Sequence, residues 1–156
     1  MRLVAALPGD LPAAICIDLH TSPHSNSYLA EILTTAGELA AHQAEDGEPI
    51  LNSRIYVAPP ETHMLIDCDK IKLTKGPREN RKRPAVDALF RSAALTCGPR
   101  VIGVVLSGEL DDGTQGLFYI KEYGGIAIAQ DPAAASSPLR HHSKHGPACL
   151  VPAVPG

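Results

Sequence analysis

The run VIGVVLSGELDDGTQGLFYIKEYGGIAIAQ, residues 101–130, decides the fold class of this chain. Its apolar start at 101–106 predicts a buried strand, and after a polar turn a helix should continue through Tyr123 to a second strand at 126–129. Two strands joined by a helix run parallel and are linked by a right-handed crossover. The run therefore predicts an α/β protein.

A second unit of strand, loop and helix stands near the N-terminus. Residues 13–19 (AAICIDL) are apolar and are followed by a polar stretch, which predicts a buried strand and a loop. Ser25 or Asn26 can cap a helix over 27–36, and Gly37 can end it. Together the two units predict an open α/β sheet whose strands are buried between helices.

The segment between these units has a different period. Short strand-like runs at 54–58, 63–67 and 71–75 are separated by Pro-Pro and Asp-Lys turns, a pattern that predicts antiparallel hairpins. A helix should then run from Pro84 to about Cys97. We therefore expect an antiparallel hairpin section within a mostly parallel sheet.

The composition limits the classes of function. At 156 residues the chain suits one domain, and its 44% hydrophobic and 20% charged residues are ordinary for a globular protein. The formal net charge of -3 gives no general attraction to nucleic acid. Because no apolar run could cross a bilayer and the N-terminus lacks the features of a signal peptide, we expect a cytoplasmic protein.

No cofactor or metal is predicted. The cysteines are Cys16, Cys68, Cys97 and Cys149. They are far apart and form no C-x-x-C pair, so we expect reduced thiols and neither a zinc site nor a redox pair. His20 and His24 are separated by Pro23, which prevents a helix that would aim both at one metal. The three histidines between 141 and 145 are more simply explained as solvated side chains.

Candidate catalytic side chains stand at the ends of two predicted strands. They are Asp18 and His20 after the first, and Glu109, Asp111 and Asp112 after the second. Ligands of an open α/β sheet gather beyond the carboxyl ends of its parallel strands. A histidine at one strand end and an acid at the neighbouring one are the base and the orienting group of a hydrolytic triad. The pattern alone leaves open a simpler alternative, a helix-capping acid and a polar loop histidine.

Five stretches of this sequence, in one order, resemble a known family. They are DLPAAICIDLHTSP, AEDGEPI, YVAPPETHMLI, GPRENRKRPAVDALFRSAA and GVVLSGELDDGTQGL. They are similar to successive motifs of the chemotaxis protein-glutamate methylesterases, the CheB-type catalytic domain, over about residues 2–132. The resemblance implies a doubly wound α/β fold and no cofactor. It also implies a Ser-His-Asp hydrolase that removes methyl esters from chemoreceptor glutamates and deamidates certain receptor glutamines.

The resemblance, carried over by position, assigns three roles. His20 matches the triad histidine of the family, and Asp112 matches its triad aspartate. Glu109 falls where the family has a residue whose backbone N–H helps to hold the oxyanion, so the side chain of Glu109 need not take part.

The nucleophilic serine of the family has no counterpart in this sequence. The family places it in a G-x-S-x-G-G turn after the first strand, and no glycine here is followed two positions later by serine. Residues 1–7 resemble the end of the first helix, so we expect that the first strand and the nucleophile elbow, about 15–20 residues, are missing. Ser22, Ser25 and Ser107 are discounted as replacements because none lies in such a turn. We expect negligible esterase activity and two unpaired strand edges in the middle of the sheet.

The remaining expectations concern domain limits and partners. A partial catalytic domain should cover residues 1–132, and an irregular or disordered tail should cover 133–156. The expected partner is a methylated chemoreceptor or a receptor-like protein, whose acidic helices suit the five positive charges between 75 and 83; a solvated loop is the simpler alternative. The receiver domain that regulates the family could act here only in trans. The rival interpretation is a non-catalytic module that binds receptor helices or a signalling partner without turnover.

Overall fold

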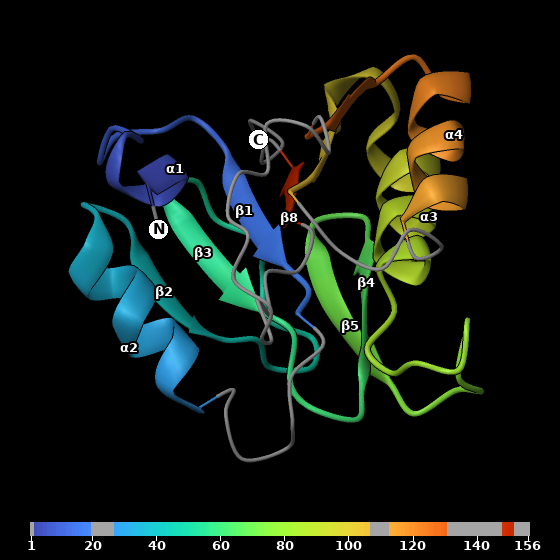
Figure 1. Ribbon diagram of the computed structural model, residues 1–156, viewed down its shortest axis with the longest axis horizontal. Helices are drawn as coiled ribbons and strands as arrows, with labels where there is room; N and C mark the ends of the chain where they lie inside the picture. Colours follow the sequence, from blue (N-terminus) through green and yellow to red (C-terminus); the bar gives the residue numbers. More distant parts are fainter. Residues whose placement is uncertain (1, 20–26, 107–112, 131–147, 152–156) are drawn as a thin grey trace, which may run out of the picture.

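The computed structural model describes residues 2–19, 27–106, 113–130 and 148–151. Its strands are β1 (Ala14–Ile17), β2 (Ala40–Gln43), β3 (Arg54–Val57), β4 (His63–Asp67), β5 (Lys70–Thr74), β6 (Ile102–Val105), β7 (Ile126–Ala129) and β8 (Ala148–Val151). Six of them form one sheet in the order β2-β3-β1-β8-β6-β7, and β4 and β5 form a separate hairpin (Figure 1). The main sheet is mostly parallel, as the sequence predicts.

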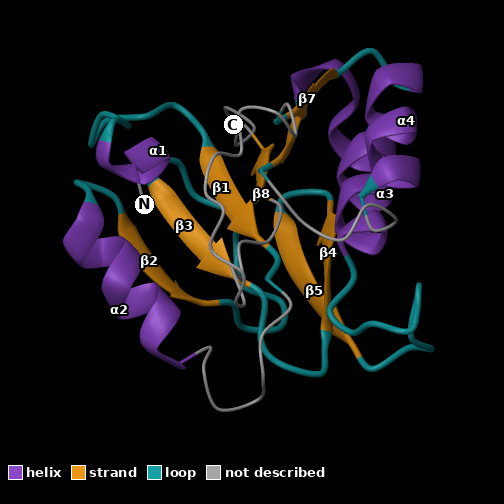
Figure 2. Ribbon diagram, in the orientation of Figure 1, coloured by secondary structure: helices purple, strands orange, loops and turns teal. Residues whose placement is uncertain are grey.

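Helices cover both faces of this sheet (Figure 2). They are α1 (Arg2–Ala5), α2 (Ser27–Ala36), α3 (Val86–Cys97) and α4 (Thr114–Glu122), with a 3-10 turn η1 (Gly98–Arg100) after α3. The first two pack on one face and the last two on the other. No helix in the described part of the chain has the length and apolarity needed to cross a membrane.

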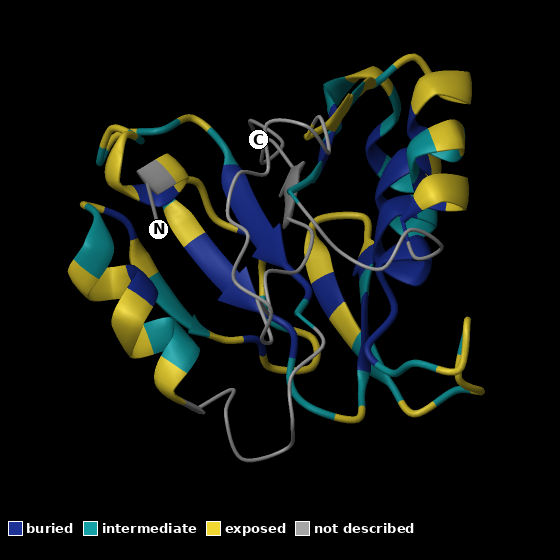
Figure 3. Cartoon of the chain, viewed as in Figure 1, coloured by how far each residue is buried: buried dark blue, intermediate teal, exposed yellow. Residues whose placement is uncertain are grey.

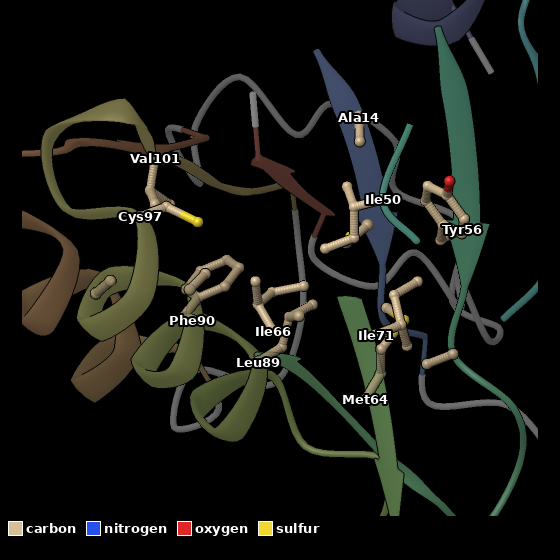
Figure 4. Close-up of a cluster of buried hydrophobic side chains, with 14 of the residues drawn as sticks. Ala14, Ile50, Tyr56, Met64, Ile66, Ile71, Leu89, Phe90, Cys97 and Val101 are labelled. Carbon is tan, nitrogen blue, oxygen red and sulfur yellow. The ribbon is translucent and has the colours of Figure 1, made fainter. Parts of the chain in front are cut away.

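Alternation along the strands divides the core into two clusters. Ile15 and Ile17 of β1 pack with the α1 and α2 side, whereas Cys16 between them belongs to the cluster under α3. Successive side chains of a strand point to opposite faces, so a continuous apolar run such as AICI buries both. Figure 3 shows the resulting burial of β1, and Figure 4 shows the α3 side of the core, where Phe90 and Tyr56 are fully buried.

Most of the predicted elements are confirmed. The helix expected over 27–36 and the strand expected at 126–129 are found with those bounds. Strands β6 and β7, which precede and follow α4 in the chain, pair in parallel with each other. The unit that decided the fold class therefore has the predicted geometry. The hairpin of β4 and β5 is antiparallel, also as predicted.

The prediction for β3 was wrong in its pairing. This strand joins the main sheet, where it runs parallel to both β1 and β2, and β2 itself was not predicted. The sequence AAHQ of β2 is poor in β-branched and aromatic residues, which explains why it gave no signal. Residues 48–50, which follow β2, lie beside the start of β5. The N–H of Ile71 donates to the carbonyl of Glu48 at 2.9 Å, and the N–H of Ile50 donates to the carbonyl of Asp69 at 2.7 Å.

Strand β8 corrects two further expectations. It lies between β1 and β6 and is antiparallel to both, so the unpaired edges expected in the middle of the sheet are paired. In this register Cys16 stands opposite Cys149, and Leu150 stands opposite both Ile15 and Ile102. A segment in this position forms backbone hydrogen bonds with two strands at once and removes two unpaired edges from solvent. This stabilisation explains why a strand is found within a tail expected to be irregular. The rest of 133–156 lies outside the described residues.

Candidate functional site

The carboxyl ends of β1 and β6 lie at the same edge of the sheet. Ile17 at the end of β1 and Val104 near the end of β6 are both paired with Ala148, from opposite sides of β8. Because neighbouring strands are about 4.8 Å apart, these two strand ends are separated by roughly 10 Å. The segments that follow Leu19 and Leu106 therefore start from neighbouring points, the kind of place where open α/β sheets bind ligands.

The predicted catalytic residues continue from these two points. His20, Glu109 and Asp112 lie outside the described residues, as does Asp111, so their roles stay predictions. Asp18, the residue that follows β1, is fully buried. The structure thus brings together the strand ends that carry the predicted base and acid, while the two side chains themselves are not described.

A buried carboxylate that sequence reasoning missed lies next to this edge. Asp87, in the first turn of α3, is 3% exposed. Its Oδ1 accepts the N–H of Gly113 at 3.1 Å and that of Gly116 at 2.7 Å, and its Oδ2 accepts Nδ2 of Asn80 at 2.9 Å. The only signal in the sequence was the glycine at 113, which has no side chain with which to cap the helix that follows it.

The basic segment at 75–83 is held in shape by acids. Nη2 of Arg78 lies 2.7 Å from Oε2 of Glu61, and Nη2 of Arg83 lies 3.5 Å from the same oxygen. Arg83 also donates to the carbonyls of Lys75 and Gly76, at 3.0 and 2.9 Å. Arg78 and Arg83 are therefore paired within the protein, while Lys75 and Arg81 are exposed.

Two further contacts fix this segment to the hairpin and to α3. His63 at the start of β4 is 2% exposed, and its Nε2 lies 2.9 Å from the carbonyl of Pro77, to which it can donate. Arg91 of α3 forms a double ion pair with Glu79, at 2.7 and 3.2 Å. The hydrogen bond with Glu79 raises the pKa of Arg91 above its ordinary value, so the guanidinium remains charged. The segment extends from the lower end of the hairpin, on the side where the arrow of β1 ends (Figure 1).

Comparisons with known proteins agree with this geometry. A family model described as CheB methylesterase matches residues 1–140. The chain belongs to the CheB methylesterase family. The resemblance found in the five sequence stretches is thereby confirmed, and the catalytic residues proposed by position belong to a domain of the expected kind.

Individual members of the family extend this result. A protein-glutamate methylesterase/protein-glutamine glutaminase of Caulobacter vibrioides is 40% identical over 139 residues, which cover 86% of this chain and 40% of the relative. A relative from Leptospira interrogans is 37% identical over 90% of this chain and 74% of its own length. The crystal structure of the Thermotoga maritima CheB methylesterase catalytic domain matches with a TM-score of 0.77 and 37% identity, over 81% of this chain and 69% of that one. The expected α/β fold class is confirmed.

Two of the three thiols described in this CheB-family domain are buried. Cys16 and Cys97 are buried and Cys68 is exposed, all three as free thiols. Burial raises the pKa of Cys16 from 9.0 to about 12 and also raises that of Cys97, so neither forms a thiolate readily. Among the described residues, no group of three or more His, Cys, Asp or Glu could hold a metal ion.

Proposed function

We propose that this domain is built to hydrolyse glutamate methyl esters, and the corresponding glutamine amides, in a receptor protein. Relatives that are 34–40% identical carry the name protein-glutamate methylesterase/protein-glutamine glutaminase. The shared edge of β1 and β6 is the observation that supports the proposal most directly, because it places the starts of the segments with His20 and Asp112 roughly 10 Å apart. A base and an orienting acid can meet across that distance.

The proposed mechanism divides the work among three groups. His20 would take the proton of a serine hydroxyl as it attacks the ester carbonyl, and would pass that proton to the departing methanol. Asp112 would hold the imidazole in its working orientation, and the backbone N–H of Glu109 would bind the oxyanion. Water would then hydrolyse the acyl-enzyme to free glutamate. This sequence contains no G-x-S-x-G turn for the nucleophile, so we expect the chain to be inactive by itself.

A graft experiment tests this proposal. The first strand, elbow and helix start of the Caulobacter vibrioides relative would be fused before Met1, and methanol release from a methylated receptor fragment would be measured. We expect no release from the unmodified chain and clear release from the fusion, abolished by His20→Ala or by replacement of the grafted serine. Release by the unmodified chain that survives His20→Ala would contradict the assignment, as would a folded fusion with no activity.

The partner proposed for the basic segment is an acidic receptor helix. Lys75 and Arg81 are exposed, and Arg78 could exchange its contact with Glu61 for a carboxylate of the partner, because an exposed ion pair contributes only about 0–1 kcal/mol. Regulation by a receiver domain in trans and a cytoplasmic location belong to the same proposal. Both would suit a domain that acts on receptor segments inside the cell.

A non-catalytic binding module is the second candidate, and the missing serine turn favours it. The two candidates share the binding step, which can be measured with a labelled glutamate-rich receptor helix. We expect that replacing Lys75 and Arg81 with alanine weakens binding roughly fivefold at low salt, whereas Arg54→Ala, an exposed cation at the start of β3, leaves it unchanged. Binding by the unmodified chain with no activity in the fusion would favour the binding module. Equal binding by all variants would show that the basic segment does not bind the receptor helix.

A further inference from the structure

The start of α4 is capped by a side chain from another helix. Its N-cap residue is Gly113, at a φ of 99°, which has no side chain of its own to accept the first N–H groups. Asp87 of α3 supplies that acceptor, at 3.1 Å from the N–H of Gly113 and 2.7 Å from that of Gly116. A carboxylate at a helix N-terminus is favoured by the partial positive charge of the exposed N–H groups.

Close packing leaves this contact little freedom. A Cβ at Gly116 would lie 2.5 Å from Cβ of Phe90 and 3.1 Å from Oδ1 of Asp87. Real Cβ atoms essentially never come within about 3.0 Å of another atom, so the contact with Phe90 means that only glycine permits the observed distance between α3 and α4 at this point. The position of the first turn of α4 is therefore set by Asp87 and Phe90 together.

The second oxygen of the same carboxylate fixes the basic segment. Nδ2 of Asn80 donates to Oδ2 of Asp87 at 2.9 Å. Asn80 and the following Arg81 both have left-handed backbone conformations, with φ of 49° and 63°, in a turn closed by backbone hydrogen bonds between Glu79 and Lys82. Residues other than glycine rarely adopt such backbone conformations unless other contacts stabilise them. One buried carboxylate thus holds both this turn and the start of α4.

We propose that Asp87 is a positioning residue, which sets the place of Asp112 relative to His20. Asp112 directly precedes Gly113 in the chain, so its Cα lies within about 3.8 Å of that of the glycine that Asp87 holds. By binding Asn80 as well, Asp87 ties the substrate-side basic segment to the same frame. This inference rests on the proposed function, in which His20 and Asp112 form the acid–base pair.

The pKa of His20, followed by NMR in the full chain, tests the proposal. The signal of His20 is assigned by its loss in His20→Gln. Asp112→Asn should lower the pKa of His20, because a nearby carboxylate stabilises the imidazolium. If Asp112→Asn has no effect, the proposed acid–base pair is wrong, and the positioning role falls with it.

Substitutions of Asp87 then separate positioning from mere stability. Asp87→Ala should produce at least about half of the fall caused by Asp112→Asn, because the fixed point that directly follows Asp112 in the chain is lost. Asp87→Asn should restore most of the wild-type value, since its amide oxygen can still accept the two glycine N–H groups while Asn80 turns its own amide. Asp10→Asn, an exposed acid near α1, is the matched control and should change nothing.

The outcomes decide between the two roles. A folded Asp87→Ala chain with an unchanged pKa of His20 would overturn the proposal, as would an Asn variant as deficient as the Ala variant. If Asp87→Ala does not fold, Asp87→Ser replaces it, because a serine hydroxyl can accept one N–H, and an intermediate pKa of His20 is expected. A serine variant that is unfolded, or that matches the wild type, would also overturn it, since Asp87 would then serve the fold alone or not at all.

Discussion

The two halves of the main sheet are built differently. In the half formed by β2, β3 and β1, all pairs are parallel, and Ile55 and Val57 of β3 are 0% and 1% exposed. In the half formed by β6 and β7, Ile126 and Ile128 are 56% and 47% exposed, and β8 provides the backbone pairing to the first half. The first half is thus stabilised by burial on both faces. The second depends on α3, α4 and a strand of four residues.

The largest expected effect compares matched isoleucines of the two halves. Ile55→Ala removes a fully buried side chain and should lower the free energy of unfolding by about 2–5 kcal/mol. Ile128→Ala removes a half-exposed one and should cost less than about 1 kcal/mol. Urea denaturation followed by circular dichroism measures both. Equal losses would show that the β7 face is covered in solution and would remove the contrast.

The next effect concerns the junction between the halves. Leu150→Pro removes the N–H of the residue that stands opposite both Ile15 and Ile102, and should destabilise the chain by about 1–3 kcal/mol, the cost of a buried backbone group left without its partner. Amide hydrogen exchange should show faster exchange in β1 and β6, whereas the pairing of β2 with β3 should keep its protection. Protection that stays unchanged in β6 would argue against β8 as the connecting strand.

Alkaline pH should weaken the first half through its buried thiol. Burial raises the pKa of Cys16 from 9.0 to about 12, and burial likewise raises the pKa of Tyr56 above 10.0. A raised pKa in the folded state gives stability that is complete below the unfolded pKa and is lost as the pH rises through the folded one. Stability should therefore fall between about pH 9 and 12, by up to about 1.4 kcal/mol per pH unit for the thiol. Cys16→Ala should flatten the dependence measured by urea midpoints; an equal slope would contradict the assignment.

The smallest effect concerns the basic segment. Glu61→Gln should cost about 0–1 kcal/mol, because its ion pairs with Arg78 and Arg83 are partly exposed to solvent. The same change should strengthen binding of an acidic helix by releasing Arg78. Thermal denaturation and binding anisotropy measure the two consequences. A large loss of stability would mean that Glu61 holds the segment more firmly than its exposure indicates.

Sequence periodicity predicted the elements that are regular by themselves. The apolar run of β1, the helical stripe of α2 and the strand β7 each carry a local signal, and each was found. The pairing partners of β3 leave no such signal in the sequence, because the same residue types are favoured in parallel and in antiparallel strands. Strand β8 is likewise specified by what β1 and β6 leave unpaired, which no local pattern records.

The candidate site shows the same division. Histidine and aspartate at two strand ends were readable from the order of strands, and the pairing of Ala148 with both Ile17 and Val104 brings those ends together. Asp87 was not readable, because its partners at 113 and 116 are distant in sequence and contribute only backbone N–H groups. His20 and Asp112 remain predictions from the motif and its position.

The register of β8 allows its pairing with β1 to be detected through a covalent bond. The Cα atoms of Cys16 and Cys149 are partners in an antiparallel pair, where such atoms lie about 4.5–5.5 Å apart, within the range that a disulfide can bridge. Because Cys16 is fully buried as a thiol in the folded protein, the link should be formed while the chain refolds from urea in an oxidised low-molecular-weight disulfide, and we expect it to join these two cysteines and to leave Cys68 unlinked to either. Peptide mass spectrometry would then report the fraction of molecules in which β8 had paired with β1.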